Sequence, residues 1–266
     1  EALGLLESIE ENDMTVPYGD RGGVVIEPLL TNQWYVDAKK LAGPAIEAVE
    51  DGRIKFVPQQ YENMYFSWMR NIQDWCISRQ RAWGVPIPVF VNKKTGEVLR
   101  DQAVFDRIAE AFEEEGGDAW FASPPARFLG NEYDAEDYEQ VRDIVDVWFD
   151  SGSTHAFVLE DRDDRQWPAS LYLEGSDQHR GWFHSSLLES CGTRGRAPYD
   201  AVLTHGFVMA EDGRKMSKSR GNDVSPQDTV EQVGAAILRI GAVGSDDAEA
   251  LGVGVGILSL QAHPYR

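Results

Sequence analysis

Residues 170–181 read SLYLEGSDQHRG, and residues 201–209 read AVLTHGFVM. Each stretch holds a short apolar run, which predicts strands over residues 170–174 and 201–209. The helical spacing of apolar residues after each run predicts helices over residues 177–190 and 225–240. Strands that alternate with helices in this way indicate an α/β fold with a parallel sheet. Ligands of such sheets bind at the carboxyl ends of the strands, so we searched those ends for chemistry.

The pentapeptide KMSKS at residues 215–219 follows the second predicted strand and a Glu-Asp-Gly turn. Two ammonium groups and two hydroxyls on one loop are suited to grip a polyphosphate, and a loop can close on its ligand and reopen. We therefore predict that Lys215 and Lys218 are catalytic and contact the β- and γ-phosphates of ATP. The same loop supplies three further predicted ATP contacts, Met216, Ser217 and Ser219.

The first predicted strand ends at Glu174 and Gly175. Gly175 lets the backbone approach a ligand closely, while Glu174, Asp177 and Gln178 have the chemistry to bind ribose hydroxyls or an α-amino group. We predict that these four residues, with His205 at the end of the next strand, bind the nucleotide or adenylate. Capping of the following helix by Ser176 and Asp177 is the alternative explanation for those two side chains.

Residues 146–153 read DVWFDSGS and predict a strand over residues 145–149 that ends at a glycine turn. Trp148 and Trp182 both lie at the predicted mouths of strands. They are predicted to form a paired apolar slot, although burial in an ordinary core is the usual fate of tryptophan.

Other patterns predict the scaffold around these motifs. Residues 65–76 carry aromatic and apolar side chains at helical spacing, residues 92–96 read as a hairpin turn, and residues 101–116 combine an Asp N-cap, an apolar stripe and a Gly stop. Residues 1–33 alternate short apolar runs with turn signals and predict a β-rich edge piece.

Composition narrows the functional class. The 266 residues carry a formal net charge of −20, which argues against a protein that coats nucleic acid, so any such contact must be local. Two cysteines, Cys76 and Cys191, are too few for a disulfide framework or a four-ligand zinc site and favour a cytoplasmic location. We predict no bound structural metal, and no apolar run approaches the roughly 20 residues of a membrane span.

Together these motifs resemble the class I aminoacyl-tRNA synthetases, and from Asp74 onward they resemble isoleucyl-tRNA synthetase. The matching blocks are residues 74–81, 83–88, 146–155, 172–183 and 203–207, followed by KMSKS. The resemblance implies ATP-dependent activation of isoleucine, with Mg²⁺ on the phosphates, and transfer to tRNA(Ile). It places the adenylate on Glu174, ATP on Lys218, and the isoleucine side chain between Trp148 and Trp182.

The resemblance also has gaps. Residues 1–73 look more like valyl-tRNA synthetase, so a junction near Asp74 and a valine–tRNA ligase stay open as alternatives. No His-x-Gly-His motif is present and the editing site is missing, apart from what looks like its final edge. We therefore expect an internal fragment, inactive alone and monomeric, or else a noncatalytic nucleotide- or tRNA-binding module.

The expected organisation has five segments. They are a remnant of the editing or connective insertion (1–33), a return into the catalytic domain (34–92), a connective insertion (93–140), the second half of a Rossmann-like catalytic domain with the KMSKS loop (141–240), and an irregular tail (241–266). The glycine-rich tail lacks periodicity, and after Arg239 we expect the family resemblance to end, as a shift of reading frame would produce.

Overall fold

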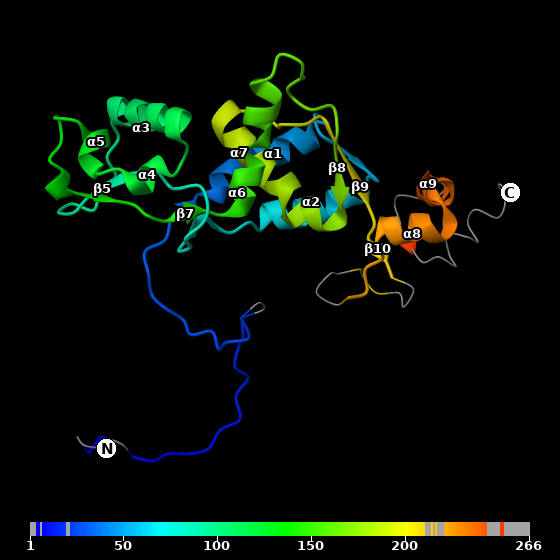
Figure 1. Ribbon diagram of the computed structural model, residues 1–266, viewed down its shortest axis with the longest axis horizontal. Coiled ribbons are helices and arrows are strands. Elements are labelled where there is room, and N and C mark those ends of the chain that lie inside the picture. Colours follow the sequence, from blue (N-terminus) through cyan, green and yellow to red (C-terminus); the bar gives the residue numbers. More distant parts are fainter. Residues whose placement is uncertain are drawn as a thin grey trace. The chain divides into compact units, whose positions relative to one another are not determined.

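A computed structural model describes residues 4–5, 7–19, 22–210, 214, 216, 221–243 and 251–252 (Figure 1). The chain divides into two units, Glu1–Gln33 and Trp34–Arg266. In the described part of the first unit, an isolated bridge joins Tyr18 and Val25, and Val24, Ile26 and the neighbouring leucines are exposed. The predicted β-rich character is therefore limited to a turn, because these apolar runs have no sheet within their own unit to pack on.

The second unit is built on a parallel sheet with the strand order β2 (Lys55–Val57), β9 (Ala201–His205) and β8 (Tyr172–Gly175). The register places Glu174 beside Thr204 and Gly175 beside His205. Both carboxyl ends therefore meet at one edge, as an α/β fold requires. The predicted strand over residues 201–209 is interrupted, since β10 (Val208–Met209) leaves this sheet and pairs with β11 (Leu251–Gly252).

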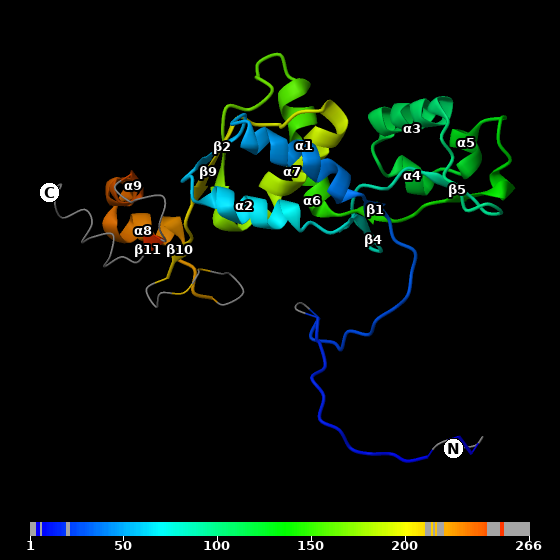
Figure 2. The ribbon, with the colours of Figure 1, turned by 180° about the vertical axis from the view of Figure 1, so that it is seen from behind.

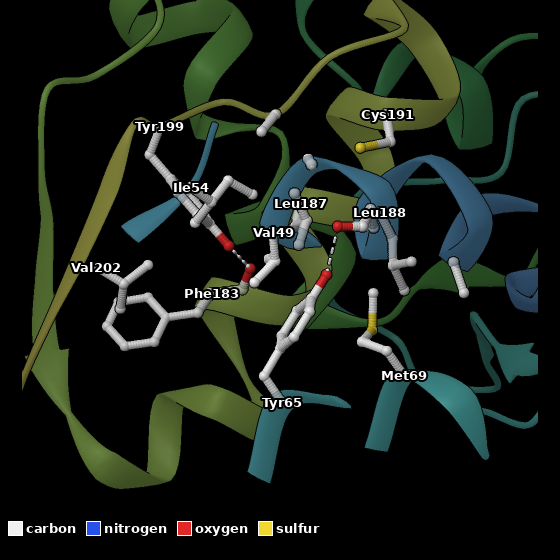
Figure 3. Packing of buried hydrophobic residues seen from close by; sticks show 14 of the residues in the cluster. Val49, Ile54, Tyr65, Met69, Phe183, Leu187, Leu188, Cys191, Tyr199 and Val202 are labelled. Carbon is white, nitrogen blue, oxygen red and sulfur yellow. Dashed lines mark hydrogen bonds between the residues drawn. The ribbon is translucent and has the colours of Figure 1, made fainter. Parts of the chain in front are cut away.

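Helices α1 (Ala38–Glu50), α2 (Tyr61–Arg70) and α7 (Trp182–Arg194) enclose the main hydrophobic core with this sheet (Figures 1 and 2). Figure 3 shows Leu187 and Leu188 of α7 packed toward Val49 of α1. Two tyrosines bring hydroxyls into this core, and each donates to a backbone carbonyl: Tyr65 to Ala45 at 2.7 Å and Tyr199 to Phe183 at 2.8 Å. Their buried polar atoms are thereby satisfied.

A second hydrophobic cluster lies within residues 90–138, and Figure 1 shows its helices grouped apart from α1, α2 and α7. Asp101 caps α3 through N–H groups of Ala103 and Val104, and α3 stops before Gly116, so the predicted helix is confirmed. The predicted hairpin turn at residues 92–96 is confirmed as well. The elements are β5 (Phe90–Asn92), α3 (Gln102–Glu115), α4 (Ala119–Ala122), α5 (Pro125–Leu129), η1 (Ala135–Asp137) and β6 (Tyr138–Gln140).

Two short antiparallel pairs connect these parts. They are β1 (Tyr35–Val36) with β3 (Trp75–Cys76), and β4 (Ser78–Arg79) with β7 (Ile144–Val145). The helical spacing that we read through residue 76 was therefore wrong at its end. Helix α2 ends at Arg70, and the aromatic and cysteine positions that follow belong to a strand.

Three other predicted elements end differently in the structure. Strand β7 stops at Val145 and helix α6 (Val147–Gly152) replaces the predicted strand over residues 145–149, because the Asp146 side chain caps a helix. The predicted helix 177–190 is split at Gly181 into η3 (Ser176–Arg180) and α7, and the predicted helix 225–240 is split at Gly234 into α8 (Pro226–Val233) and α9 (Ala235–Val243). Gly234 has φ +86°, a conformation that costs other residues strain.

A short π-helix, η2 (His155–Glu160), follows α6. Among the described residues, none of the helices has both the length and the apolar character needed to span a membrane.

Replacing Leu187 with Ala tests the role of α7 in the main core. Leu187 is fully buried, so we expect Leu187→Ala to lower the free energy of unfolding by about 2–5 kcal/mol in urea titrations. Leu171→Ala is the matched control, because Leu171 is 45% exposed and its truncation is expected to cost about 0.5 kcal/mol or less. Equal losses for the two variants would contradict this description of the core.

Candidate functional site

The carboxyl edge of β8 and β9 brings three of the predicted ligand-binding residues together. A Cβ atom on Gly175 would lie 2.9 Å from Asp177 Oδ1 and 3.6 Å from His205 Cε1. Gly175 is therefore the residue that lets the Asp177 carboxylate and the His205 ring approach the same strand end. Glu174 lies at this edge with an exposed side chain. The edge thus presents two carboxylates and an imidazole to solvent.

His179 faces the opposite way, into the core. Its Nε2 lies 2.9 Å from Thr204 Oγ1, and its ring stacks on Tyr61 with centroids 4.7 Å apart. Burial lowers the pKa of His179 to about 4, so the ring is neutral at pH 7. The structure gives His179 a structural role, because it ties η3 to β9.

Gln178 and Trp148 converge on Gly181. A Cβ atom there would lie 2.6 Å from Gln178 Oε1 and 2.9 Å from Trp148 Cζ3, so a side chain at this position has no room. Gln178 Oε1 also accepts a hydrogen bond from the backbone N–H of Trp182 at 3.0 Å. Gly181 therefore serves as the contact point between α6 and the start of α7, a role that its place inside a predicted helix concealed.

The two tryptophans of the predicted slot come from α6 and α7, which pack against each other. Trp148 is 42% exposed, whereas Trp182 stacks on Tyr172 with ring centroids 4.0 Å apart. The Trp182 indole N–H donates to the Ser151 carbonyl at 2.9 Å. Trp182 is thus fixed by core contacts and Trp148 is accessible. A slot between them stays a prediction.

A cavity of about 400 Å³ adjoins Trp148. Trp68, Trp75 and His184 are among its lining residues, and burial with the nearby Arg180 lowers the pKa of His184 to about 4. Among the described lining residues, neither carboxylate of the exposed strand edge is present. We therefore locate the candidate site by the strand ends and not by this cavity.

Asp146 organises α6, and the sequence alone did not reveal how. Its Oδ1 accepts the backbone N–H of Trp148 at 2.8 Å, and its Oδ2 forms an ion pair with Arg79 of β4. The side chain of Asp146 is nearly buried, which strengthens this pair relative to an exposed one. The aspartate immediately before an apolar run was the available signal, since that is the pattern of an N-cap.

Glu189 supports α6 from the other side. A Cβ atom on Gly152 would lie 2.1 Å from Glu189 Oε1, so the carboxyl group lies directly against this glycine. The Oε1 atom is buried without a hydrogen-bond partner among the described residues. Burial, and secondarily the Asp150 carboxylate, raises the pKa of Glu189 to about 9, so this side chain is a neutral acid at pH 7.

Other predictions concern the loop and the caps. The N-cap position of η3 is Gly175, so Ser176 and Asp177 lie inside this short helix, and capping by their side chains stays an alternative. The Ala210 N–H donates to the Arg214 carbonyl at 2.8 Å, which closes the turn before the lysine loop, and Met216 is half-buried. The remaining predicted loop residues, Lys215, Ser217, Lys218 and Ser219, lie outside the described residues.

Glu189→Gln tests the neutral buried acid. Because the folded-state pKa of about 9 exceeds the value near 4.5 of an unfolded glutamate, the native state is penalised as pH rises from about 4.5 to about 9. We expect the stability difference between Glu189→Gln and the parent chain to be smallest at about pH 4 and to grow above about pH 4.5. The variant should become the more stable protein toward pH 8, by up to about 1.4 kcal/mol per pH unit in urea titrations.

The exposed Glu113→Gln serves as the control for that experiment, because it removes the same group without burial. Its stability difference from the parent should stay within about 0.5 kcal/mol. A Glu189→Gln difference that does not change with pH would show that this acid is ionised in the fold.

Comparison with known proteins places these features in a family. The family model described as tRNA synthetases class I (I, L, M and V) matches residues 2–253. This match continues past Arg239, where we expected the resemblance to end. The family pattern therefore extends into the segment that we had read as an irregular tail.

Curated relatives cover both sides of Asp74. The chain is 52% identical over 252 residues to the isoleucine–tRNA ligase of Pelagibacter ubique, which covers 94% of the chain and 28% of that protein. It is 57% identical over 244 residues to the isoleucine–tRNA ligase of Mesorhizobium japonicum, which covers 89% of the chain and 24% of that protein. One relative thus aligns across the junction that we considered, and the chain spans about a quarter of the length of these relatives.

Solved structures show the same fold at low sequence identity. The methionyl-tRNA synthetase of Mycobacterium tuberculosis, solved with methionyl-adenylate, aligns with a TM-score of 0.60 at 17% identity and covers 93% of this chain and 40% of that one. The LeuRS of Agrobacterium radiobacter K84, in a ternary complex with tRNA and LeuAMS, aligns with a TM-score of 0.53 at 18% identity and covers 72% of this chain and 27% of that one. A parallel α/β sheet and a family match over nearly all of the sequence lead to one conclusion: the chain belongs to the class I tRNA synthetases.

Proposed function

We propose that the chain is the adenylate-forming part of an isoleucine–tRNA ligase. In the proposed reaction, the carboxylate of isoleucine attacks the α-phosphorus of ATP and the bond to pyrophosphate breaks, which forms isoleucyl-adenylate. The isoleucyl group then passes to a hydroxyl of tRNA(Ile), and AMP leaves. The observation that carries this proposal is the convergence of Gly175, Asp177 and His205 at the carboxyl edge of β8 and β9, in a chain that is 51–57% identical to isoleucine–tRNA ligases.

The strand edge is suited to the adenosine and amino-acid ends of the substrates. Carboxylates at Glu174 and Asp177 accept hydrogen bonds from ribose hydroxyls or from an α-ammonium group. The amide of Gln178 can both donate and accept, although in the unliganded chain its oxygen is used by the Trp182 N–H. Gly175 has no side chain to keep a nucleotide from the backbone, and the side chains of Asp177, His205 and Phe207 surround this position.

The phosphate end belongs to the KMSKS loop in this proposal. Lys215 and Lys218 offset the charge that builds up as pyrophosphate leaves, while Met216, Ser217 and Ser219 complete the loop around the phosphates. In this proposal the KMSKS segment, which lies between β10 and α8 in the sequence, closes over the bound phosphates and reopens to release pyrophosphate.

Mg²⁺ is the metal that this chemistry implies. The described residues hold no cluster of three or more His, Cys, Asp or Glu side chains suited to a metal ion. Mg²⁺ usually accompanies ATP through phosphate oxygens and water. When bound, it would neutralise phosphate charge, and the carboxylates of Glu174 and Asp177 on the strand edge are its candidate protein ligands.

Isoleucine is assigned to the Trp148 and Trp182 region. An accessible indole beside a fixed one provides an apolar wall for a branched side chain. Such a wall separates isoleucine from valine by only about 1–3 kcal/mol, a limit for which isoleucyl-tRNA synthetases are themselves the standard example. Full selectivity therefore requires parts of the enzyme beyond this site.

The remaining assignments are part of the same proposal. We assign residues 34–92 and 141–240 to the catalytic domain, residues 93–140 to a connective insertion, residues 1–33 to the edge of the editing insertion, and residues 241–266 to a terminal segment. We also propose a monomer that acts in the cytoplasm, which agrees with two free cysteines.

Pyrophosphate exchange into ATP tests the proposal. We expect the chain alone to show little isoleucine-dependent exchange, because it spans about a quarter of the length of the relatives. Grafted in place of the homologous span of the Pelagibacter ubique ligase, it should support exchange with isoleucine in preference to valine. Lys218→Ala in the graft should lower the rate about a hundredfold or more, by removing a cation aimed at the phosphates.

Lys93→Ala, in the exposed hairpin turn of the second cluster, is the matched control and should leave exchange unchanged. A graft that prefers valine would favour the valine alternative. A graft that binds ATP or tRNA but forms no adenylate would establish the noncatalytic module instead.

A further inference from the structure

Trp83 is the most exposed large hydrophobic side chain among the described residues of the second unit, with 89% of its surface open to solvent. Single exposed apolar residues are common on proteins, but a tryptophan this exposed is unusual because it is among the largest apolar side chains. Its position therefore calls for an explanation beyond chance exposure.

The backbone around Trp83 is fixed. Gly84 has φ +152°, and a Cβ atom there would lie 2.3 Å from the Cδ1 atom of the buried Ile144. Directly after it, Val85 accepts the backbone N–H of Val145 at 2.8 Å and Ile87 donates to Asp143 at 2.9 Å. The chain is thus hydrogen-bonded to β7 two residues after the indole. Trp83 projects from an ordered edge, so the backbone loses little conformational entropy when a ligand binds.

A cation lies two residues before the indole. Arg81 is exposed and has no ion pair among the described residues. The two preceding arginines are engaged, since Arg79 pairs with Asp146 and Arg70 pairs with Glu50. Arg81 is therefore the arginine of this stretch whose charge is available to a phosphate.

An exposed indole next to an available guanidinium matches the chemistry of single-stranded nucleic acid. Unpaired bases stack on aromatic side chains and the adjoining phosphates pair with arginine. Double-stranded RNA offers no free base faces along its length and is read mainly through its backbone. The formal charge of −20 makes a broad electrostatic surface improbable and favours a small contact of this kind.

We propose that Trp83 and Arg81 form a contact for an unpaired stretch of RNA, in which Trp83 stacks on a base and Arg81 neutralises a neighbouring phosphate. This contact rests on the proposed function, because it would serve the tRNA substrate.

Fluorescence anisotropy with a labelled single-stranded RNA of about 12 nucleotides tests the contact on the chain itself, at about 50 mM salt. We expect saturable binding that is weaker for the same RNA annealed to its complement. Trp83→Ala should weaken binding about fivefold to a hundredfold, the effect of losing one stacked base. Trp83→Phe should recover part of that loss, and Arg81→Gln should weaken binding and lower the salt dependence by about one phosphate contact.

Two matched controls separate this site from general effects. Phe157→Ala removes a different exposed aromatic ring, 56% open to solvent, and Arg100→Gln removes a different exposed arginine. Neither should change the RNA affinity by more than about twofold. Three results would each overturn the proposal. They are equal losses of RNA affinity for Trp83→Ala and Phe157→Ala, equal affinity for the single strand and the duplex, and absence of saturable binding.

The grafted ligase distinguishes this proposal from the proposed function. There, Trp83→Ala should leave isoleucine-dependent pyrophosphate exchange unchanged while it weakens tRNA binding. If Trp83→Ala lowers the stability of the graft and leaves tRNA affinity intact, the indole packs against protein and the proposed RNA contact is wrong. A graft without exchange whose RNA affinity still depends on Trp83 would refute the ligase assignment alone.

Discussion

The parallel pairing of β8 with β9 is the constraint on which the candidate site depends. Its register sets Gly175 beside His205, and the buried contact between His179 and Thr204 holds η3 to the neighbouring strand just beneath that edge. With a neutral His179 in the core, the polar groups left at the surface are those suited to a nucleotide. The short helix η3 therefore has two roles: His179 packs into the core, and the polar residues at the strand edge face the candidate site.

The position of helix α6 depends on two glycines that let neighbouring side chains come close to the backbone. Gly152 and Gly181 are the points at which a side chain has no room, against Glu189 in one case and against Gln178 and Trp148 in the other. Asp146 fixes the start of this helix by capping it and by pairing with Arg79. The accessible Trp148 is thus placed by buried contacts on both sides, which is what a wall for a small apolar side chain requires.

The sequence was informative where a local signal acts alone. Asp101 and the glycines after residue 115 predicted α3 with its limits, and the βα alternation predicted the parallel sheet. It was misleading where tertiary contacts decide. Periodicity could not show that Gly181 breaks a helix, because the break is imposed by packing against Trp148. Nor could it pair Glu189 with Gly152, which are brought together only by the packing of α6 on α7.

The central claim is that the β8–β9 edge and the lysine loop bind one nucleotide. Photocrosslinking of the chain with an azido-ATP, followed by peptide mapping, tests it most directly. The account predicts labelling on peptides that contain Glu174 to Gln178 or residues 204–220, and its loss when unmodified ATP is added in excess. The account would be contradicted if the labelling that excess ATP removes were confined to residues 90–140, around the second hydrophobic cluster.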